Sequence, residues 1–236
     1  MSNSDRFINK YNELEKIAYQ KFPDDIKTDH GAVAQLEKMR IFYNIKDDLK
    51  YIRELRNFFQ HNIKIDSLYP VEATDSLIEL VERIILKVQN PPKVLDKCIR
   101  FEKICYATKD DLIYEYMLKM KKNVYTHIPI LENKIVVGVF SENTLLGALT
   151  EEEIIYDKNE TKFCDPLIFK HCTLENHVSE IFKFVSKDTY LEEVKEMFKR
   201  SFIDNKRLSL IFITEHGIET EKIIGIITPW DILGNN

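Results

Sequence analysis

The second half of this chain contains an internal repeat, and no other feature restricts the fold as strongly. Residues 108–115 align with residues 186–193, with a hydroxyl residue, a Lys-Asp pair and a later glutamate in common. Residues 125–131 then align with 208–214, and residues 138–146 with 225–233. The spacing changes only between these segments, where insertions are tolerated. Two copies of one unit predict two sheets that bury their faces against each other.

Each copy has the sequence pattern of a small α+β domain. Short β-branched runs at 128–131, 135–140, 208–214 and 223–227 alternate with helical patterns. One helix of each copy has apolar residues at equivalent positions, namely Ile113, Tyr116 and Met120 in the first and Leu191, Val194 and Phe198 in the second.

Each copy ends in a strand followed by Gly-apolar-apolar-Ser/Thr and a helix start. This order of elements resembles the cystathionine-β-synthase (CBS) domain, and two copies resemble a tandem CBS pair over residues 95–234. The copies span about 100–150 and 180–234. The second is the better match, through Gly225-Ile-Ile-Thr228-Pro-Trp-Asp231.

The resemblance implies a regulatory site for an adenine nucleotide (AMP, ADP or ATP). Thr228 would meet a phosphate, Asp231 would accept hydrogen bonds from the ribose, and the adenine would lie near Ile104. In the first copy Ser141 keeps the hydroxyl, but Thr144 stands where the aspartate belongs. We therefore expect at most one good ribose site.

An alternative remains open for the second motif. Thr228 and Asp231 also suit the start of a helix that has proline in its first turn, with no ligand involved. Trp230, the only tryptophan, could pack in a core or an interface, or could cover a base.

The first half of the chain is helical in pattern. Phe7, Tyr11, Leu14, Ala18 and Phe22 recur at spacings of three and four, and three further amphipathic segments follow up to residue 88. Asn90-Pro91-Pro92 has the character of a linker. We predict an all-α four-helix bundle over residues 1–92 and the CBS pair over residues 93–236.

The third of these helices ends in Arg56-Asn57-Phe-Phe-Gln-His61. Arg-Asn-x-x-x-His in a small helical bundle resembles the HEPN domain, over residues 5–88. The resemblance implies a metal-independent ribonuclease that acts on RNA as a homodimer. Arg56 would stabilise phosphate charge, His61 would transfer protons and Asn57 would orient one of them. A non-catalytic helical module, in which Arg56 only pairs with an acid such as Asp47 or Glu54, is the alternative.

Composition excludes several other classes of protein. The net charge is −5 and neither half is basic overall, so any polyanion site must be local. There is no GxGxxG or P-loop motif, no membrane-length apolar run and no signal peptide. Four scattered cysteines predict reduced thiols in a cytoplasm, and no metal site.

Together these features predict a cytoplasmic, homodimeric sensor. In it, a nucleotide bound to the CBS pair controls an HEPN-like domain. The rival function is a non-enzymatic dimeric adaptor that uses the CBS pair only for assembly.

Overall fold

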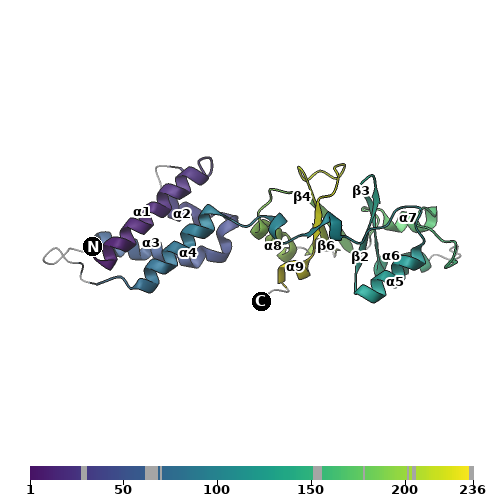
Figure 1. Cartoon of the computed structure of the whole chain (residues 1–236), viewed down its shortest axis with the longest axis horizontal. Helices are drawn as coiled ribbons and strands as arrows, with labels where there is room; N and C mark the ends of the chain where they lie inside the picture. The colour runs from purple at the N-terminus through teal and green to yellow at the C-terminus, as the bar shows by residue number, and fades with distance from the viewer. Residues whose placement is uncertain are drawn as a thin grey trace. The chain divides into compact units, whose positions relative to one another are not determined.

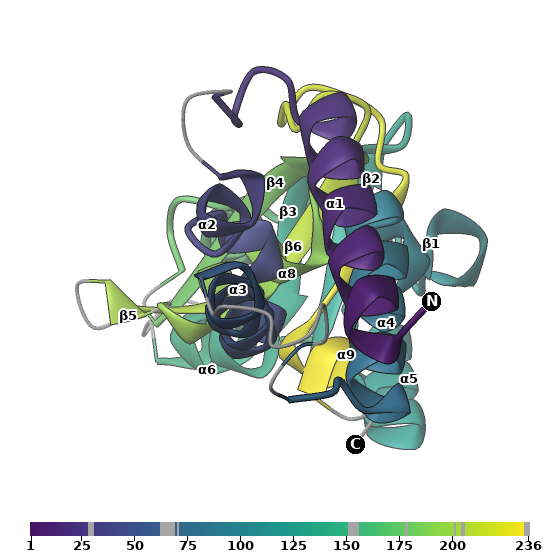
Figure 2. The same ribbon diagram turned by 90° about the vertical axis from the view of Figure 1, so that its left-hand side faces the viewer.

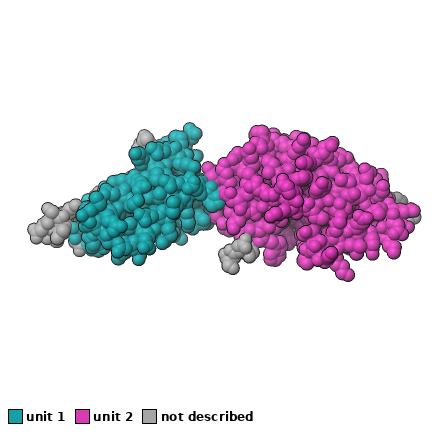
Figure 3. Space-filling model, in the orientation of Figure 1, with its two compact units in different colours: residues 1–92 teal, residues 93–236 magenta. Residues whose placement is uncertain are grey.

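The structure, a computed structural model, describes residues 1–27, 31–61, 69, 71–150, 156–177, 179–200, 202–203 and 206–233. It divides into two compact units, residues 1–92 and residues 93–236, which are coloured separately in Figure 3. None of the helices in these described ranges combines the length and the apolar character that a membrane span needs.

The first unit is helical, as predicted. Its elements are α1 (Asn3–Lys21), α2 (Ala32–Leu36), the 3₁₀ helix η1 (Arg40–Ile45), α3 (Lys46–His61) and α4 (Asp75–Gln89). Helices α1 and α4 lie side by side in both views (Figures 1 and 2). The stripe predicted for the first helix is buried, with at most 5% of any of its five residues exposed.

Helix ends in this unit follow local chemistry. The Ser2 hydroxyl accepts a hydrogen bond from the Asp5 amide and the Asp5 carboxylate accepts one from the Ser2 amide, which together cap α1. Thr74 caps α4 in the same way through the Leu77 amide. Helix α2 has only five residues, and the chain turns extended at Met39 before it enters the 3₁₀ segment η1.

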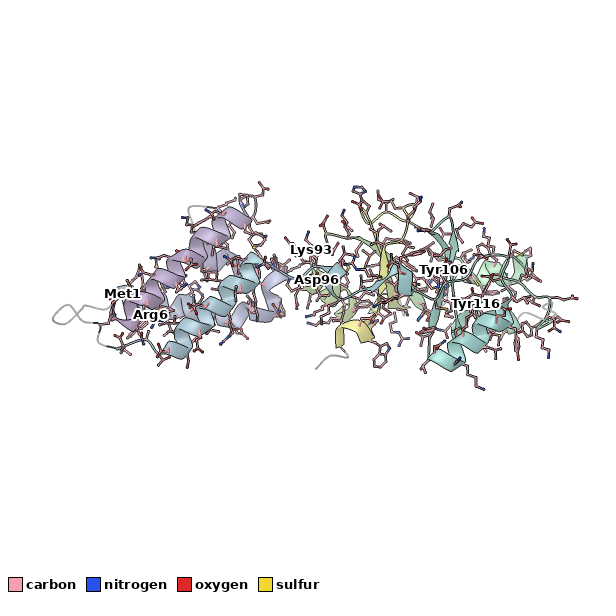
Figure 4. All side chains as sticks on the ribbon, in the orientation of Figure 1. Met1, Arg6, Lys93, Asp96, Tyr106 and Tyr116 are labelled. Atoms are coloured by element: carbon pink, nitrogen blue, oxygen red, sulfur yellow. The ribbon has the colours of Figure 1, made fainter. Side chains whose placement is uncertain are left out.

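The second unit alternates helices and strands. Its elements are η2 (Val94–Asp96), β1 (Ile99–Arg100), η3 (Phe101–Lys103), α5 (Ile113–Asn123), β2 (His127–Glu132), β3 (Ile135–Ser141), α6 (Glu142–Leu149), α7 (Pro166–Cys172), β4 (Glu180–Ser186), α8 (Leu191–Lys199), β5 (Phe202–Ile203), β6 (Lys206–Thr214), β7 (Gly225–Ile227) and α9 (Pro229–Leu233). Figure 4 labels Lys93 and Asp96, where this unit begins, and Tyr116 on α5. The Asp96 carboxylate accepts a hydrogen bond from the Lys93 amide at 2.8 Å.

The strands form two sheets. One has the order β1-β7-β6-β4, with β5 also paired to β6, and the other is the hairpin β2-β3. Strand β4 runs parallel to β6, and Val185 pairs with Ile213. In the first copy Ala107 forms a parallel bridge with Ile130. The repeat alignment places Ala107 opposite Val185 and Ile130 opposite Ile213. The strand pairing in the structure therefore agrees with the alignment.

The two sheets bury their inner faces against each other, as the repeat predicts. One buried cluster joins Leu131, Val136 and Val139 of the first copy to Leu210, Phe212 and Ile226 of the second. The helices lie outside, with α8 and α9 on one side of the strands and α5, α6 and α7 on the other (Figure 1). This arrangement leaves the loops that follow β3 and β7 at the junction of the copies.

The glycine of each motif is fixed by a close approach of backbone. A Cβ atom on Gly138 would lie 2.6 Å from the carbonyl oxygen of Cys172, and one on Gly225 would lie 2.9 Å from that of Ile99. Any side chain at either position would therefore push the neighbouring segment away. The glycines allow each motif strand to sit against its neighbour.

Candidate functional site

Thr228 connects β7 to α9, and its polar groups are bonded locally. The Thr228 amide and hydroxyl both donate hydrogen bonds to Asp231 Oδ2, each at 2.7 Å. Pro229 is the first residue of α9. This is the helix-start arrangement that the sequence left open as an alternative. The other carboxylate oxygen of Asp231 accepts no hydrogen bond from any residue that the structure describes.

Thr228 also lies on a cleft of about 440 Å³. The cleft is mainly apolar, and its lining residues are Ile99, Lys103, Ile104, Cys105, Val124, Tyr125, Thr126, His127, Leu210, Ile226, Thr228 and Trp230. The structure thus brings Ile104 and Thr228 to one cavity. Asp231 does not line it, and Trp230 is 78% exposed beside it rather than packed in a core.

The chain reaches this cleft through an unfavourable backbone conformation. Val124 ends α5 in the left-handed region, at φ 59° and ψ 36°. A β-branched residue adopts this region only at a cost in energy. The turn directs the chain into Tyr125 and Thr126, which line the cleft.

A second cavity, of about 450 Å³, adjoins the first. It shares Thr126, His127, Thr228 and Trp230 with the first cleft, and it extends to Ser141. Its remaining lining residues are polar or charged for the most part, namely Glu142, Asn143, Glu180, Arg207, Ser209 and Pro229. The two motif residues Ser141 and Thr228 therefore line the same groove.

Ser141 is far less accessible than Thr228. It caps α6 and is 1% exposed, while Thr144 is 4% exposed. The Thr144 hydroxyl accepts a hydrogen bond from the Ser141 amide at 2.5 Å, the cap position that Asp231 fills in the second copy. The Ser141 hydroxyl donates to Glu180 Oε2 at 2.8 Å.

Glu180 is a buried carboxylate that the sequence analysis did not identify. It is 4% exposed and lies at the start of β4. His127 Nε2 is 2.8 Å from its Oε1, and His177 Nδ1 is 3.3 Å from its Oε2. Burial opposes ionisation, but the hydrogen bonds from His127, His177 and Ser141 outweigh it and hold the pKa of Glu180 well below its usual range.

The low pKa of Glu180 predicts a loss of stability in acid. Because the pKa is lowered in the folded state, ionised Glu180 stabilises the fold above its ordinary pKa of 4.5, and this contribution is lost as the pH falls below that value. We expect the melting temperature of the wild-type second unit to fall more steeply below about pH 4.5 than that of Glu180→Gln. Thermal unfolding of the full chain between about pH 6 and pH 3, followed by circular dichroism, measures this difference.

The matched control is Glu102→Gln, which removes an exposed carboxylate of the same unit. Its melting curve should keep the wild-type dependence on pH. Parallel curves for wild type and Glu180→Gln down to about pH 3 would contradict the role assigned to this carboxylate.

In the first unit the predicted motif residues differ in their surroundings. The Arg56 guanidinium carbon lies 5.5 Å from the centre of the Tyr11 ring, and Nε has no hydrogen-bond partner among the described residues. Asn57 is exposed. His61 is the last residue of α3, and its side chain lies outside the described part of the structure.

The acids proposed as partners of Arg56 do not pair with it. Within the described residues, no ion pair joins Arg56 to Asp47 or Glu54. The neighbouring Arg53 is paired instead. Its Nε lies 2.5 Å from Glu37 Oε1, and its Nη2 lies 3.3 Å from Glu37 Oε2.

Comparison with known proteins identifies the second copy. Residues 178–235 match the CBS domain family, so the C-terminal unit is a CBS-type α+β module. The first copy lies outside the matched range. No curated protein matches the chain in sequence.

Solved structures also align with part of this chain. A CBS domain protein from Streptococcus pneumoniae is 17% identical, with 58% of this chain and 78% of that one covered and a TM-score of 0.42. CbpB in complex with c-di-AMP is 12% identical, with 63% and 87% covered and a TM-score of 0.46. CBSX2 in complex with AMP is 17% identical, with 61% and 94% covered and a TM-score of 0.41.

Proposed function

We propose that residues 93–236 form a tandem CBS pair that binds an adenine nucleotide (AMP, ADP or ATP) in the cleft at Thr228, and that the nucleotide regulates residues 1–92. The observation that carries this proposal is the cleft itself. It combines an apolar wall with a motif hydroxyl in a volume of about 440 Å³, within the range of small-molecule sites.

The lining suits the two halves of a nucleotide. Ile99, Ile104 and Ile226 offer an apolar surface to a purine. The exposed indole of Trp230 supplies an aromatic face on which a base can stack. Lys103 provides donors for phosphate oxygens, and the Thr228 hydroxyl would turn from Asp231 to donate to a phosphate oxygen.

Asp231 contributes through its second carboxylate oxygen in this proposal. Oδ2 holds the Thr228 amide and hydroxyl, so Oδ1 is the atom that remains to accept from the ribose. The same residue would then fix the loop and recognise the sugar. The helix-start arrangement and the ligand site are compatible.

A thermal-shift screen of the full chain tests nucleotide binding. A ligand at 100 times its dissociation constant should add about 2.7 kcal/mol to the stability of the unit that binds it. The screen should contain AMP, ADP, ATP, their cyclic relatives and S-adenosylmethionine. Thr228→Val, which removes only the hydroxyl function, is the matched control and should reduce the shift. An unchanged melting temperature with every ligand would contradict the proposal.

For the helical unit we propose an HEPN-like domain with metal-independent ribonuclease activity, acting on RNA as a homodimer. Arg56, Asn57 and His61 would be its catalytic residues. The cation of Arg56 supports this role, because it is not neutralised by Asp47 or Glu54. Nucleotide binding could bias this domain only by the difference in nucleotide affinity between two packings of the chain.

A non-enzymatic adaptor is the second candidate function. It is favoured by the packing of the Arg56 guanidinium on the Tyr11 ring, which is also what a purely structural arginine does. In that case the CBS pair would serve assembly alone.

A further inference from the structure

A buried polar cluster joins the two copies of the repeat at the first motif. Ser141 and His127 belong to the first copy, whereas His177 and Glu180 lie at the entrance to the second. The Glu180 carboxylate accepts a hydrogen bond from the Ser141 hydroxyl and contacts both imidazoles, at 2.8 to 3.3 Å. All four are largely buried, with Ser141 1% and Glu180 4% exposed and the side chains of His127 and His177 10% and 1% exposed.

The repeat shows what this cluster replaces. Ser141 of the first motif aligns with Thr228 of the second, and the alignment of 125–131 with 208–214 places His127 opposite Leu210. Extended back without a gap, the alignment of 108–115 with 186–193 places His177 opposite Ile99. At the second motif, Leu210 and Ile99 are apolar lining residues of the open cleft.

The residue that aligns with Glu180 is Glu102. Glu102 is exposed, and no hydrogen bond joins it to Thr228 in the described structure. The two related sites therefore differ in one respect above all. Ser141 is buried, at 1% exposure, against Glu180, a carboxylate from outside its own motif, whereas the Thr228 hydroxyl bonds to Asp231 of its own motif and Thr228 lines an open cleft.

We propose that Glu180 is a built-in occupant of the first nucleotide position, so that the CBS pair takes one adenine nucleotide per chain, at Thr228. This inference rests on the proposed function of the Thr228 cleft. It further implies that removal of the Glu180 carboxylate would uncover a second anion site, formed by Ser141, His127 and His177.

Charge and hydrogen bonding give the reason for this asymmetry. A nucleotide phosphate at Ser141 would have to approach an ionised, buried carboxylate, and repulsion is poorly screened in such a place. It would also have to reach a serine that is only 1% exposed and whose hydroxyl is donated to Glu180. Glu142 and Arg207 line the same groove with opposite charges, so the exclusion rests on Glu180 itself.

Titration calorimetry of the full chain with AMP, ADP and ATP tests the inference. Wild type should bind one nucleotide per chain, and Glu180→Ala should bind two. Glu102→Ala, the matched control at the aligned position, should bind one. Glu180→Gln should also bind one, because the amide fills the same space.

A second variant decides the question even if Glu180→Ala does not fold. Thr228→Val in the otherwise wild-type chain should weaken binding of the single nucleotide, because the closed first position cannot take it instead. Wild-type affinity and stoichiometry in Thr228→Val, or binding of two nucleotides by wild type, would overturn the inference and leave nucleotide binding by the CBS pair intact.

Inorganic phosphate separates this inference from the proposed function. Glu180→Ala should bind phosphate, with a stabilising shift that Glu102→Ala does not show. If no nucleotide binds to wild type, the proposal of one nucleotide per chain fails together with the proposed function. Phosphate binding by Glu180→Ala would still support an anion site that Glu180 covers in wild type. A folded Glu180→Ala that binds neither phosphate nor a second nucleotide overturns the inference.

Discussion

Arg56→Ala and His61→Ala should each abolish cleavage of single-stranded RNA by the full chain. Positioned acid–base groups contribute about 10²–10⁴-fold to such reactions, and a charge that stabilises the transition state contributes on the order of 10²–10³-fold. The loss should therefore reach the background of the assay. Cleavage of a fluorescently labelled RNA, with and without saturating nucleotide, is the measurement.

Arg53→Ala is the matched control for Arg56→Ala. Arg53 lies one turn earlier on α3 and is engaged by Glu37, so its loss should reduce cleavage less. Both variants should keep the wild-type circular dichroism spectrum and sedimentation coefficient. Cleavage should survive EDTA and leave a 2′,3′-cyclic phosphate, so that DNA and 2′-O-methyl RNA resist.

Two outcomes would redirect the interpretation of the helical unit. Purified protein that leaves RNA intact with every nucleotide would favour the adaptor. Cleavage that persists in His61→Ala would instead place the activity at another site, and Arg56 would then have the structural role that its packing on Tyr11 indicates.

Asp231→Ala should lower nucleotide affinity about ten- to hundredfold, because loss of a charged hydrogen-bond partner costs about 1.5–3 kcal/mol. The same variant removes the acceptor of the Thr228 amide and hydroxyl, so it should also loosen the start of α9. Affinity from calorimetry and melting temperature from circular dichroism report these two effects separately.

Thr144→Ala is the control at the aligned position of the first copy. Thr144 accepts a hydrogen bond from the Ser141 amide, so its loss should cost about 1 kcal/mol of stability. It should leave nucleotide affinity unchanged. Equal losses of affinity in Asp231→Ala and Thr144→Ala would mean that the nucleotide site has been assigned to the wrong copy.

The features that the sequence predicted well are those encoded by local periodicity. The stripe from Phe7 to Ala18 repeats at the helical period, and every member of it is buried. The repeat predicted two sheets packed face to face. The pairs Val185–Ile213 and Ala107–Ile130 are formed by residues that the repeat alignment makes equivalent. Such signals need no knowledge of distant contacts.

The Glu180 cluster could not be predicted in this way. Its members come from β2, the end of β3, the segment before β4 and β4 itself, and they meet only when the two copies pack. In the sequence nothing marked His177 or Glu180 as buried. One signal was available, since the alignment places the polar residues His177 and His127 opposite the apolar Ile99 and Leu210.

Helix α7 was missed, and the position of Trp230 was left open. Helix α7 has only seven residues, too few for a periodic pattern, and Asp165 and Pro166 alone mark its start. Trp230 was expected in a core or an interface or over a base, and its 78% exposure beside the cleft follows from the position of α9 on the sheet.

Trp230 also provides the most direct test of the central claim, that an adenine nucleotide occupies the cleft at Thr228. It is the only tryptophan in the chain and lines that cleft and the adjoining cavity, so its fluorescence reports on this region of the CBS unit. Titration with AMP, ADP or ATP should produce a saturable quench and blue shift as a base covers the indole, and Thr228→Val should weaken the response. N-acetyltryptophanamide, titrated in parallel, corrects for absorption by adenine. Emission that stays that of a water-exposed indole throughout, once corrected, would contradict the account.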